Sequence, residues 1–262
     1  MNLYKMDPVD KTQWPHSLPR SQPQPPVSIL TPTYNRAKFF PALIKCIQAQ
    51  TYPRDRFEWL IYDDGTERID EIIAPYMTAL NIRYFTSDTK LLIGAKRNKL
   101  HEEARGTILV VFDDDDYYMP ERISHAVQTL VSKKVSIVGS SRMHLYFADD
   151  ASIWTAGPYW PNHATFGSMA YTKSYAIAHK CDETITHAEE SSFTNQYKEP
   201  LIQLDPQKVM VCICHSENTF SKDGLRQSAS NKLKKTGLTI KSFIRDKELR
   251  DFYSAPKTSH SI

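Results

Sequence analysis

The chain has 262 residues, of which 40% are hydrophobic and 24% charged, so it can bury a sizeable core as one large domain or two small ones. This composition is typical of a globular protein, and a net charge of +3 is too small to indicate nucleic-acid binding. The four cysteines show no zinc-type pairs, and no apolar run reaches the roughly 18 residues that span a bilayer. Because the sequence shows no signal-peptide pattern either, we expect a cytoplasmic protein.

Residues 1–26 contain six prolines and little apolar periodicity. Proline restricts the backbone and cannot continue a helix or a sheet ladder. We therefore predict a proline-rich N-terminal arm that either wraps around the body of the protein or stays loose.

Strands and helices alternate along the next hundred residues. Short apolar and β-branched runs predict strands at residues 27–31, 58–62, 82–85 and 107–112. Between them, apolar residues recur at helical spacing, and Gly94 and Pro120 stand at the start of two further helices. This alternation indicates an α/β fold with a mostly parallel, Rossmann-like sheet flanked by helices.

Polar clusters follow three of these strands, at residues 31–36, 63–66 and 113–116. Right-handed crossovers place the carboxyl ends of parallel strands along one rim, where open α/β sheets bind ligands. The last cluster is the run of four carboxylates Asp113, Asp114, Asp115 and Asp116, which would repel one another without a cation. The alternative is a hydrated acidic loop, but the position after a buried strand favours Mg²⁺ or Mn²⁺ that bridges substrate phosphates.

The second half of the chain is less regular, with predicted strands at residues 135–139, 143–147, 152–155 and 209–214. Tyr159 and Trp160 are suited either to stack on a sugar or to fill a core, and the sequence leaves both open. Residues 186–193 predict the start of a helix that continues to Tyr197. His215 and Asn218 follow the last strand and so reach the same rim.

Four segments of the chain resemble, in order and spacing, the motifs of family 2 glycosyltransferases of the GT-A fold. They are Thr31-Pro32-Thr33-Tyr34-Asn35-Arg36, Asp63-Asp64-Gly65, Gly94-Ala95-Lys96-Arg97-Asn98, and the aspartate run followed by Pro120. The resemblance covers residues 27–220. It implies a single GT-A domain with a nucleotide-sugar half at 27–133 and a smaller, mixed acceptor half at 134–220, followed by a basic tail at 221–262.

The resemblance implies that the rim binds a nucleotide-diphosphate sugar, with UDP-sugar as the expected donor. Asp63 or Asp64 would accept a hydrogen bond from the imide N–H of uracil, and Arg97 would pair with phosphate oxygens. Residues 63–66 are also a good turn and helix cap without any ligand. The donor-binding residues expected from the motifs are Thr31, Pro32, Tyr34, Asn35, Arg36, Asp63, Asp64, Arg97, Asp113 and Asp114.

In the family the metal-binding signature is Asp-x-Asp. Asp113-x-Asp115 and Asp114-x-Asp116 both have this spacing, and the distance to Pro120 favours Asp115 as the metal ligand. Asp113 would then reach the ribose, or the metal through a water molecule. His215 is a further candidate ligand for Mn²⁺ or Mg²⁺, although a single histidine is more often structural.

Glu189 and Glu190 precede an apolar residue, as a Glu-Asp pair does in the family, where the second carboxylate is the catalytic base. On that register Glu190 is the base and Glu189 its neighbour, with Glu where Asp is usual. An ionised carboxylate can take a proton from an acceptor hydroxyl. Two glutamates in the first turn of a helix are also favourable with the helix dipole alone.

The sequence thus predicts a metal-dependent glycosyltransferase that moves a sugar, with inversion, to a hydroxyl of a glycan, lipid or protein. Two other classes stay open: a nucleotidyltransferase or hydrolase, and a catalytically silent nucleotide-sugar-binding module. The lack of glycine in residues 31–36 counts against a nucleotidyltransferase. The basic tail is read as a lid over the nucleotide, as a weak contact with an anionic membrane surface that would make the protein peripheral, or as ordinary solvated charge.

Overall fold

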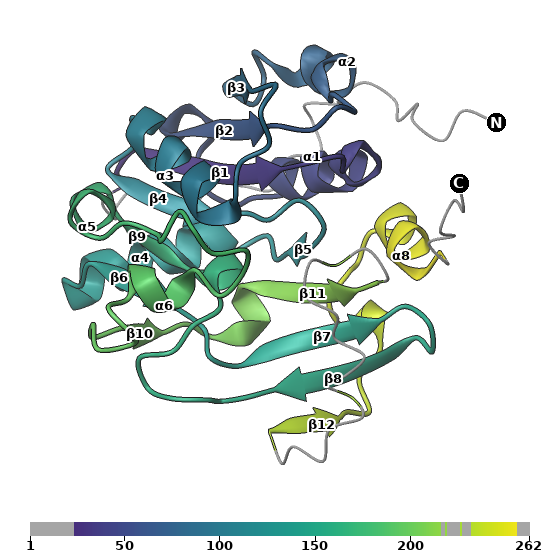
Figure 1. The fold of residues 1–262 in the computed structure, drawn as a ribbon. Helices are drawn as coiled ribbons and strands as arrows, with labels where there is room; N and C mark the ends of the chain where they lie inside the picture. Colours follow the sequence, from purple (N-terminus) through teal and green to yellow (C-terminus); the bar gives the residue numbers. More distant parts are fainter. Residues whose placement is uncertain (1–23, 216–217, 219–225, 227–231, 256–262) are drawn as a thin grey trace.

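The computed structural model describes residues 24–215, 218, 226 and 232–255 (Figure 1). The predicted N-terminal arm therefore lies outside the described residues except for its last three. Those three are fixed by the domain that follows. The carbonyl of Pro25 accepts a hydrogen bond from the Tyr52 hydroxyl at 2.6 Å, and that of Pro26 accepts one from the Thr107 amide at 2.9 Å.

A mostly parallel sheet forms the centre of the molecule and confirms the predicted fold class (Figure 1). In the described part of the chain it has seven strands in the order β10-β6-β9-β4-β1-β2-β3. β9 runs antiparallel to both of its neighbours, and the other pairs are parallel. The strands are β1 (Val27–Thr33), β2 (Phe57–Asp63), β3 (Ile82–Thr86), β4 (Ile108–Val111), β6 (Ile137–Gly139), β9 (Ala170–Thr172) and β10 (Ile202–Gln203).

The central strands β1, β2 and β4 are buried along almost their whole length because both faces of the sheet are covered. Side chains alternate between the faces, so Ile29 and Val110 enter one hydrophobic cluster, whereas Leu30 and Leu109 enter the other. β1 runs on through Pro32 to Thr33, two residues beyond its predicted end, and pairs with β2 to its last residue. Because β1 and β4 are parallel neighbours, the polar residues that follow them lie at the same edge of the sheet.

Helices flank this sheet as predicted. α3 packs on β1 and β2, and α4 packs on β4, β6 and β9. The helix predicted to continue to Tyr197 ends at Phe193, because Asn195, Gln196 and Tyr197 all have positive φ, which a right-handed helix does not allow. The helices are α1 (Phe40–Gln48), α2 (Asp70–Ile73), α3 (Ile93–Glu103), α4 (Arg122–Lys133), α5 (Lys173–Ala178), α6 (Glu190–Phe193) and α8 (Lys247–Ser254). None of the helices within the described ranges has the length and apolar character needed to cross a membrane.

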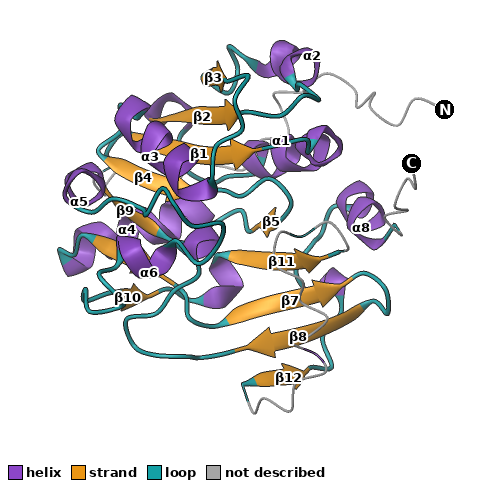
Figure 2. Cartoon of the chain, in the orientation of Figure 1, coloured by secondary structure: helices purple, strands orange, loops and turns teal. Residues whose placement is uncertain are grey.

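A second, mixed sheet lies beside the first (Figure 2). Its described strands follow the order β12-β8-β7-β11-β5, and only the β7–β11 pair is parallel. They are β5 (Tyr117–Tyr118), β7 (Met143–Phe147), β8 (Ser152–Ala156), β11 (Met210–Cys214) and β12 (Leu233–Lys235). The second half of the chain also supplies β6, β9 and β10 to the main sheet, so the two predicted halves share one continuous structure.

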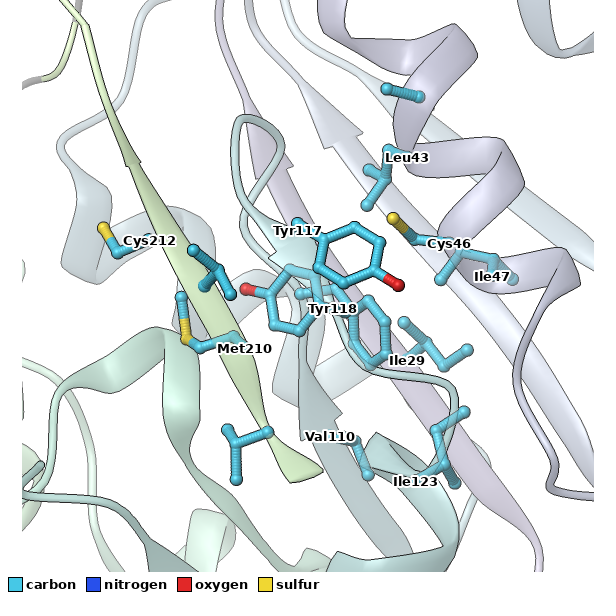
Figure 3. Close-up of a cluster of buried hydrophobic side chains, with 14 of the residues drawn as sticks. Ile29, Leu43, Cys46, Ile47, Val110, Tyr117, Tyr118, Ile123, Met210 and Cys212 are labelled. Carbon is cyan, nitrogen blue, oxygen red and sulfur yellow. The ribbon is translucent and has the colours of Figure 1, made fainter. Parts of the chain in front are cut away.

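The tyrosines of β5 join the two sheets immediately after the aspartate run. Tyr118 pairs with Met210 and Tyr117 with Val211 in an antiparallel ladder. Both rings are buried and lie between β11 and α1 (Figure 3). The aspartate run is therefore held at both ends, by β4 before it and by the β5–β11 pair after it.

Residues 233–254 lie within the part of the chain predicted as a basic tail, but they belong to the folded body. Phe243, Ile244, Leu249 and Tyr253 are buried in the same core as the main sheet. The Tyr253 hydroxyl donates a hydrogen bond to the carbonyl of Asp116 at 3.1 Å. Sequence analysis missed this because these apolar residues are interspersed with charged residues of both signs, and only tertiary contacts bury them.

Replacing Leu249 on α8 tests whether this segment is part of the domain. Leu249 is buried, so Leu249→Ala should lower the free energy of unfolding by about 2–5 kcal/mol, through lost transfer energy and a residual cavity. Lys247→Ala, on the exposed side of the same helix, should change it by less than about 0.5 kcal/mol. Urea titration measures both, and equal small effects would show that α8 is not packed on the core.

Candidate active site

One cavity of about 510 Å³ opens at the carboxyl edge of the main sheet. Its walls come from the residues after β1, the start of α3, the aspartate run, the loop before β9 and residues 186–190. Its size is in the range of pockets that bind cofactors and small substrates. Of the predicted site residues, those on its wall are Pro32, Tyr34, Arg36, Arg97, Asp113, Asp114, Asp115, Glu189 and Glu190.

Each aspartate of the run contacts a different partner. Arg97 Nη2 lies 3.2 Å from Asp113 Oδ1, and Thr33 Oγ1 donates to Asp114 Oδ2 at 2.7 Å. Arg36 Nη1 donates to Asp115 Oδ2 at 3.0 Å. Asp116 turns into the protein, where its Oδ1 accepts a hydrogen bond from the Ile213 amide at 2.9 Å. Three carboxylates thus face the cavity and the fourth holds the turn.

The run concentrates negative charge in a poorly solvated place. Burial raises the pKa of Asp113, and burial together with the adjacent Asp115 charge raises the pKa of Asp114 to about 7. Both pKa values rise for the same reason: the ionised carboxylates are removed from water and lie next to like charges, which costs free energy. A cation in the cavity would relieve this cost.

Asp115 and His215 are brought together from distant parts of the chain. His215 Nε2 lies 3.2 Å from Asp115 Oδ2, and its ring stacks on Phe39 with centroids 4.9 Å apart. Asn218 Nδ2 donates to the same Asp115 oxygen at 3.2 Å. The structure therefore places two of the three predicted metal ligands side by side, whereas Asp113 pairs with Arg97.

This donor set fits a divalent ion that is shared with a ligand. Across the described ranges, no three His, Cys, Asp or Glu side chains are grouped closely enough to hold a metal by themselves. Mg²⁺ bound with nucleotides usually takes only one or two protein carboxylates, with phosphate and water oxygens completing the shell. One carboxylate and one imidazole suit Mn²⁺ in the same arrangement.

Arg97 is the central cation of the site. Its Nε donates to Glu189 Oε1 at 2.6 Å, and its guanidinium lies over the Phe166 ring, 4.0 Å from the centroid. Burial alone would lower the pKa of Arg97, but Asp113 and Glu189 outweigh it and raise the pKa. Arg97 therefore links the aspartate run to the glutamate pair.

The two glutamates have different surroundings. The Glu189 carboxylate is paired with Arg97, and the residue is 5% exposed. Glu190 begins α6 and lines the cavity. Burial, together with the charge of Glu189, raises the pKa of Glu190 to about 7. A carboxyl group with this pKa can exchange a proton near neutral pH, which is what general acid–base chemistry requires.

Four residues predicted to bind the donor do not line the cavity. Thr31 is buried and accepts a hydrogen bond from Trp59 Nε1 at 2.9 Å. Asn35, at a φ of 52°, accepts the amides of Thr66 and Glu67 through its side chain. Both positions shape the loops around the site from behind its wall.

Asp63 and Asp64 are the other two. Asp63 accepts hydrogen bonds from the Gly65 amide at 2.9 Å and the Tyr84 hydroxyl at 2.6 Å. Asp64 binds Lys96 Nζ and the Leu91 amide, both at 2.6 Å. The Gly65 contact matches the turn interpretation, but the next helix begins only at Asp70 with Ile69 as its N-cap, so the segment does not cap it. The contact with a nucleobase stays a prediction.

Sequence reasoning missed the lysines and the small residues of the cavity wall. Lys96 Nζ also donates to the Thr33 carbonyl at 3.1 Å, and Lys90 Nζ lies 4.0 Å from the centroid of the Tyr34 ring. A Cβ on Gly167 would lie 2.6 Å from Asp113 Oδ2, so a larger residue there would displace the Asp113 carboxylate. Lys96 stands next to Arg97 in a motif that the sequence did identify, and that adjacency was the available signal.

Known proteins resemble this chain in sequence and in fold. The model of the family described as "Glycosyl transferase family 2" matches residues 28–188. The chain is 29% identical over 119 residues to glycosyltransferase AglE of Haloferax volcanii, a match that covers 45% of this chain and 39% of that protein. It is 30% identical over 101 residues to the poly(ribitol-phosphate) beta-N-acetylglucosaminyltransferase TarS of Staphylococcus aureus, covering 38% of this chain and 18% of TarS. The chain thus spans less than half the length of these relatives.

Solved structures show the same fold. TarS residues 1–349 in complex with UDP-GlcNAc superpose with a TM-score of 0.59 and 19% identity, covering 71% of this chain and 58% of that one. The mannosyltransferase PcManGT of Pyrobaculum calidifontis, in complex with GDP-Man and Mn²⁺, gives a TM-score of 0.61 and 16% identity, covering 78% and 61%. At these identities the likeness shows the fold alone.

Removing Arg97 should destabilise the protein by leaving Glu189 buried without its cation. We expect Arg97→Met to lower the free energy of unfolding by about 3–5 kcal/mol, the usual cost of breaking a buried ion pair from one side. Adding Glu189→Gln should restore part of that loss, because the unpaired charge is gone. Urea unfolding of both single variants and the double variant measures the coupling. A loss below about 1 kcal/mol for Arg97→Met would contradict this role.

Proposed function

The chain belongs to glycosyl transferase family 2, and on that premise we propose that it transfers a sugar from a nucleotide-diphosphate sugar to a hydroxyl group of an acceptor. The donor is a UDP-sugar, the reaction depends on Mn²⁺ or Mg²⁺, and the anomeric carbon is inverted. One observation carries the proposal: the four residues of the aspartate run, four basic residues and Glu190 border the same cavity.

The basic side chains account for binding of the donor diphosphate. Arg36, Lys90, Lys96 and Arg97 all line the cavity, next to the aspartate run. Guanidinium and ammonium groups pair with phosphate oxygens in charge-assisted hydrogen bonds. The relatives TarS and PcManGT bind UDP-GlcNAc and GDP-Man, so both nucleotides belong in the test of the donor.

Asp115 and His215 would hold the divalent ion. When bound, the ion would supply positive charge that offsets the negative charge developing on the departing diphosphate. Arg36 already contributes positive charge at Asp115, and Arg97 does so at Asp113. These guanidinium groups stay at the wall of the cavity and can stabilise the same leaving group.

Glu190 is the proposed base. In its ionised form it takes the proton from the acceptor hydroxyl while that oxygen attacks the anomeric carbon, and the diphosphate leaves from the opposite face. Attack opposite the leaving group inverts the anomeric carbon. Glu189, paired with Arg97, is a positioning residue that keeps α6 and Glu190 at the cavity.

Asp115→Asn tests the metal-dependent donor site. Wild-type protein should show a rise in melting temperature with UDP or UDP-sugars and Mn²⁺ that chelator removes, because a ligand of the folded state stabilises it by mass action. Asp115→Asn should lose most of the metal-dependent part, whereas Asp70→Asn on exposed α2 should keep it. An undiminished Mn²⁺-dependent rise in Asp115→Asn would refute this ligand, and a response to GDP alone would correct the donor.

Glu190→Gln tests the base. Release of nucleoside diphosphate from nucleotide sugars with Mn²⁺ and a mixture of sugar acceptors should fall about 10²–10⁴-fold in Glu190→Gln, because proton removal is lost. The exposed Glu67→Gln serves as the control. In wild type, kcat/KM should fall as the pH falls through about 7, since the base works ionised and its pKa is raised to about 7. A full rate in Glu190→Gln, or an acidic limb near pH 4, would refute the assignment.

A further inference from the structure

A cluster of aromatic rings stands beside the cavity and has no role in the reaction described above. Tyr159, Trp160 and His163 come from the loop after β8, and Tyr197 comes from the turn after α6. The rings of Trp160 and Tyr197 are stacked, with centroids 6.3 Å apart and an interplanar angle of 29°. His163 lies among them, 4.9 Å from Tyr159, 5.7 Å from Trp160 and 5.1 Å from Tyr197.

The loop that carries these rings is held by hydrogen bonds at several points. Gln203 Nε2 donates to the carbonyls of Pro161 and His163 at 2.7 and 2.9 Å. The Gly157 amide donates to the Lys232 carbonyl at 2.9 Å. A Cβ on Gly157, whose φ is +81°, would collide with the Ser141 carbonyl. The rings are therefore presented on a fixed backbone, which lowers the entropy that a ligand must remove on binding.

The cluster is not a closed core. Trp160 is 57% exposed, whereas His163 is 9% exposed, and the His163 Nδ1 has no hydrogen-bond partner among the described residues. Lys232 Nζ lies 4.8 Å from the centroid of Trp160 and 5.2 Å from that of Tyr159. A flat apolar face and a cation thus occur together at the surface, over a buried histidine.

The chain connects the cluster to the cavity wall on the side of Glu190, although the rings themselves do not line the cavity. The loop runs directly into Thr165, Phe166 and Gly167, which line the cavity. On the other side, Thr194 Oγ1 accepts the Tyr197 amide and donates to the Glu190 carbonyl. Tyr197 and Glu190 are thereby linked through one side chain, that of Thr194.

We propose that Tyr159, Trp160 and Tyr197 form a stacking platform for a sugar unit of a carbohydrate acceptor, whose neighbouring hydroxyl is thereby presented to Glu190. The inference rests on the proposed function, because it identifies the acceptor of that same site as a glycan. Sugar rings combine an apolar C–H face with hydroxyls at the edge. The apolar face suits the aromatic rings, and the hydroxyls suit the Lys232 ammonium group.

A lipid surface fits these features less well. Binding to a bilayer interface needs a broad apolar face, and here only Trp160 among the clustered rings is largely exposed. A protein acceptor would need a larger interface, of which the platform could form only a small part. One exposed ring with polar groups at its edge has the size and character of a monosaccharide site.

The test is direct binding of four probe oligosaccharides by calorimetry: chitotetraose, maltotetraose, cellotetraose and mannotetraose. Wild type, Trp160→Ala, Trp160→Phe and Ile177→Ala are compared. Ile177 is 68% exposed on α5, so its replacement removes surface apolar area without touching the platform. We expect wild type to bind at least one probe, Trp160→Ala to bind it about tenfold or more weakly, and Trp160→Phe, which keeps a flat ring, to lose less. Ile177→Ala should match wild type.

Two results would overturn the platform. Either wild type binds none of the four probes, or Trp160→Ala binds a probe as tightly as wild type does. Vesicles of phosphatidylcholine and phosphatidylglycerol form a further arm, and vesicle binding that only Trp160→Ala abolishes would assign the ring to a lipid surface instead. The thermal shift of wild type with UDP or GDP and Mn²⁺ is recorded alongside. A nucleotide response without Trp160-dependent sugar binding refutes only the platform, whereas sugar binding without a nucleotide response refutes only the transferase function.

Discussion

The accumulation of carboxylates at the end of β4 is the constraint on which the rest of the site depends. Asp113, Asp114 and Asp115 follow a strand that is buried on both faces and are themselves only partly exposed, so water screens their charges incompletely. Each carboxylate has its own partner: Arg97 for Asp113, Thr33 for Asp114 and Arg36 for Asp115. These partners come from β1, the loop after it and α3. Their contacts with the aspartate run therefore also hold those elements together.

Charge pairing also gives the two glutamates different surroundings. Glu189 and Glu190 are adjacent and chemically identical, yet Arg97 binds only the first. Glu190 is left at the cavity wall with a neighbouring negative charge, and burial with that charge raises its pKa to about 7. Arg97 therefore acts on both sides of the cavity, by pairing with Asp113 and with Glu189.

The second sheet and the C-terminal segment hold the end of the aspartate run in place. β11 pairs with β5 directly after the aspartate run, and its Ile213 amide binds Asp116. α8 adds the Tyr253 hydroxyl at the carbonyl of the same residue. Residues more than 90 positions apart in the sequence thus hold the turn that directs three carboxylates into the cavity. We therefore expect substitutions in α8 to affect the aspartate run through this contact.

The sequence by itself determined the alternation of strands and helices, the shared edge for the residues after β1 and β4, and the family. These follow from local apolar periodicity and from motif order, which are properties of neighbouring residues. Only the tertiary structure decided that Asp63 and Asp64 are bound by Tyr84 and Lys96, and that His215 lies next to Asp115. It alone also showed the core packing of α8 and the aromatic cluster around Trp160. Such pairings join distant segments, and a carboxylate or an aromatic ring has the same local signature whether a protein group or a ligand becomes its partner.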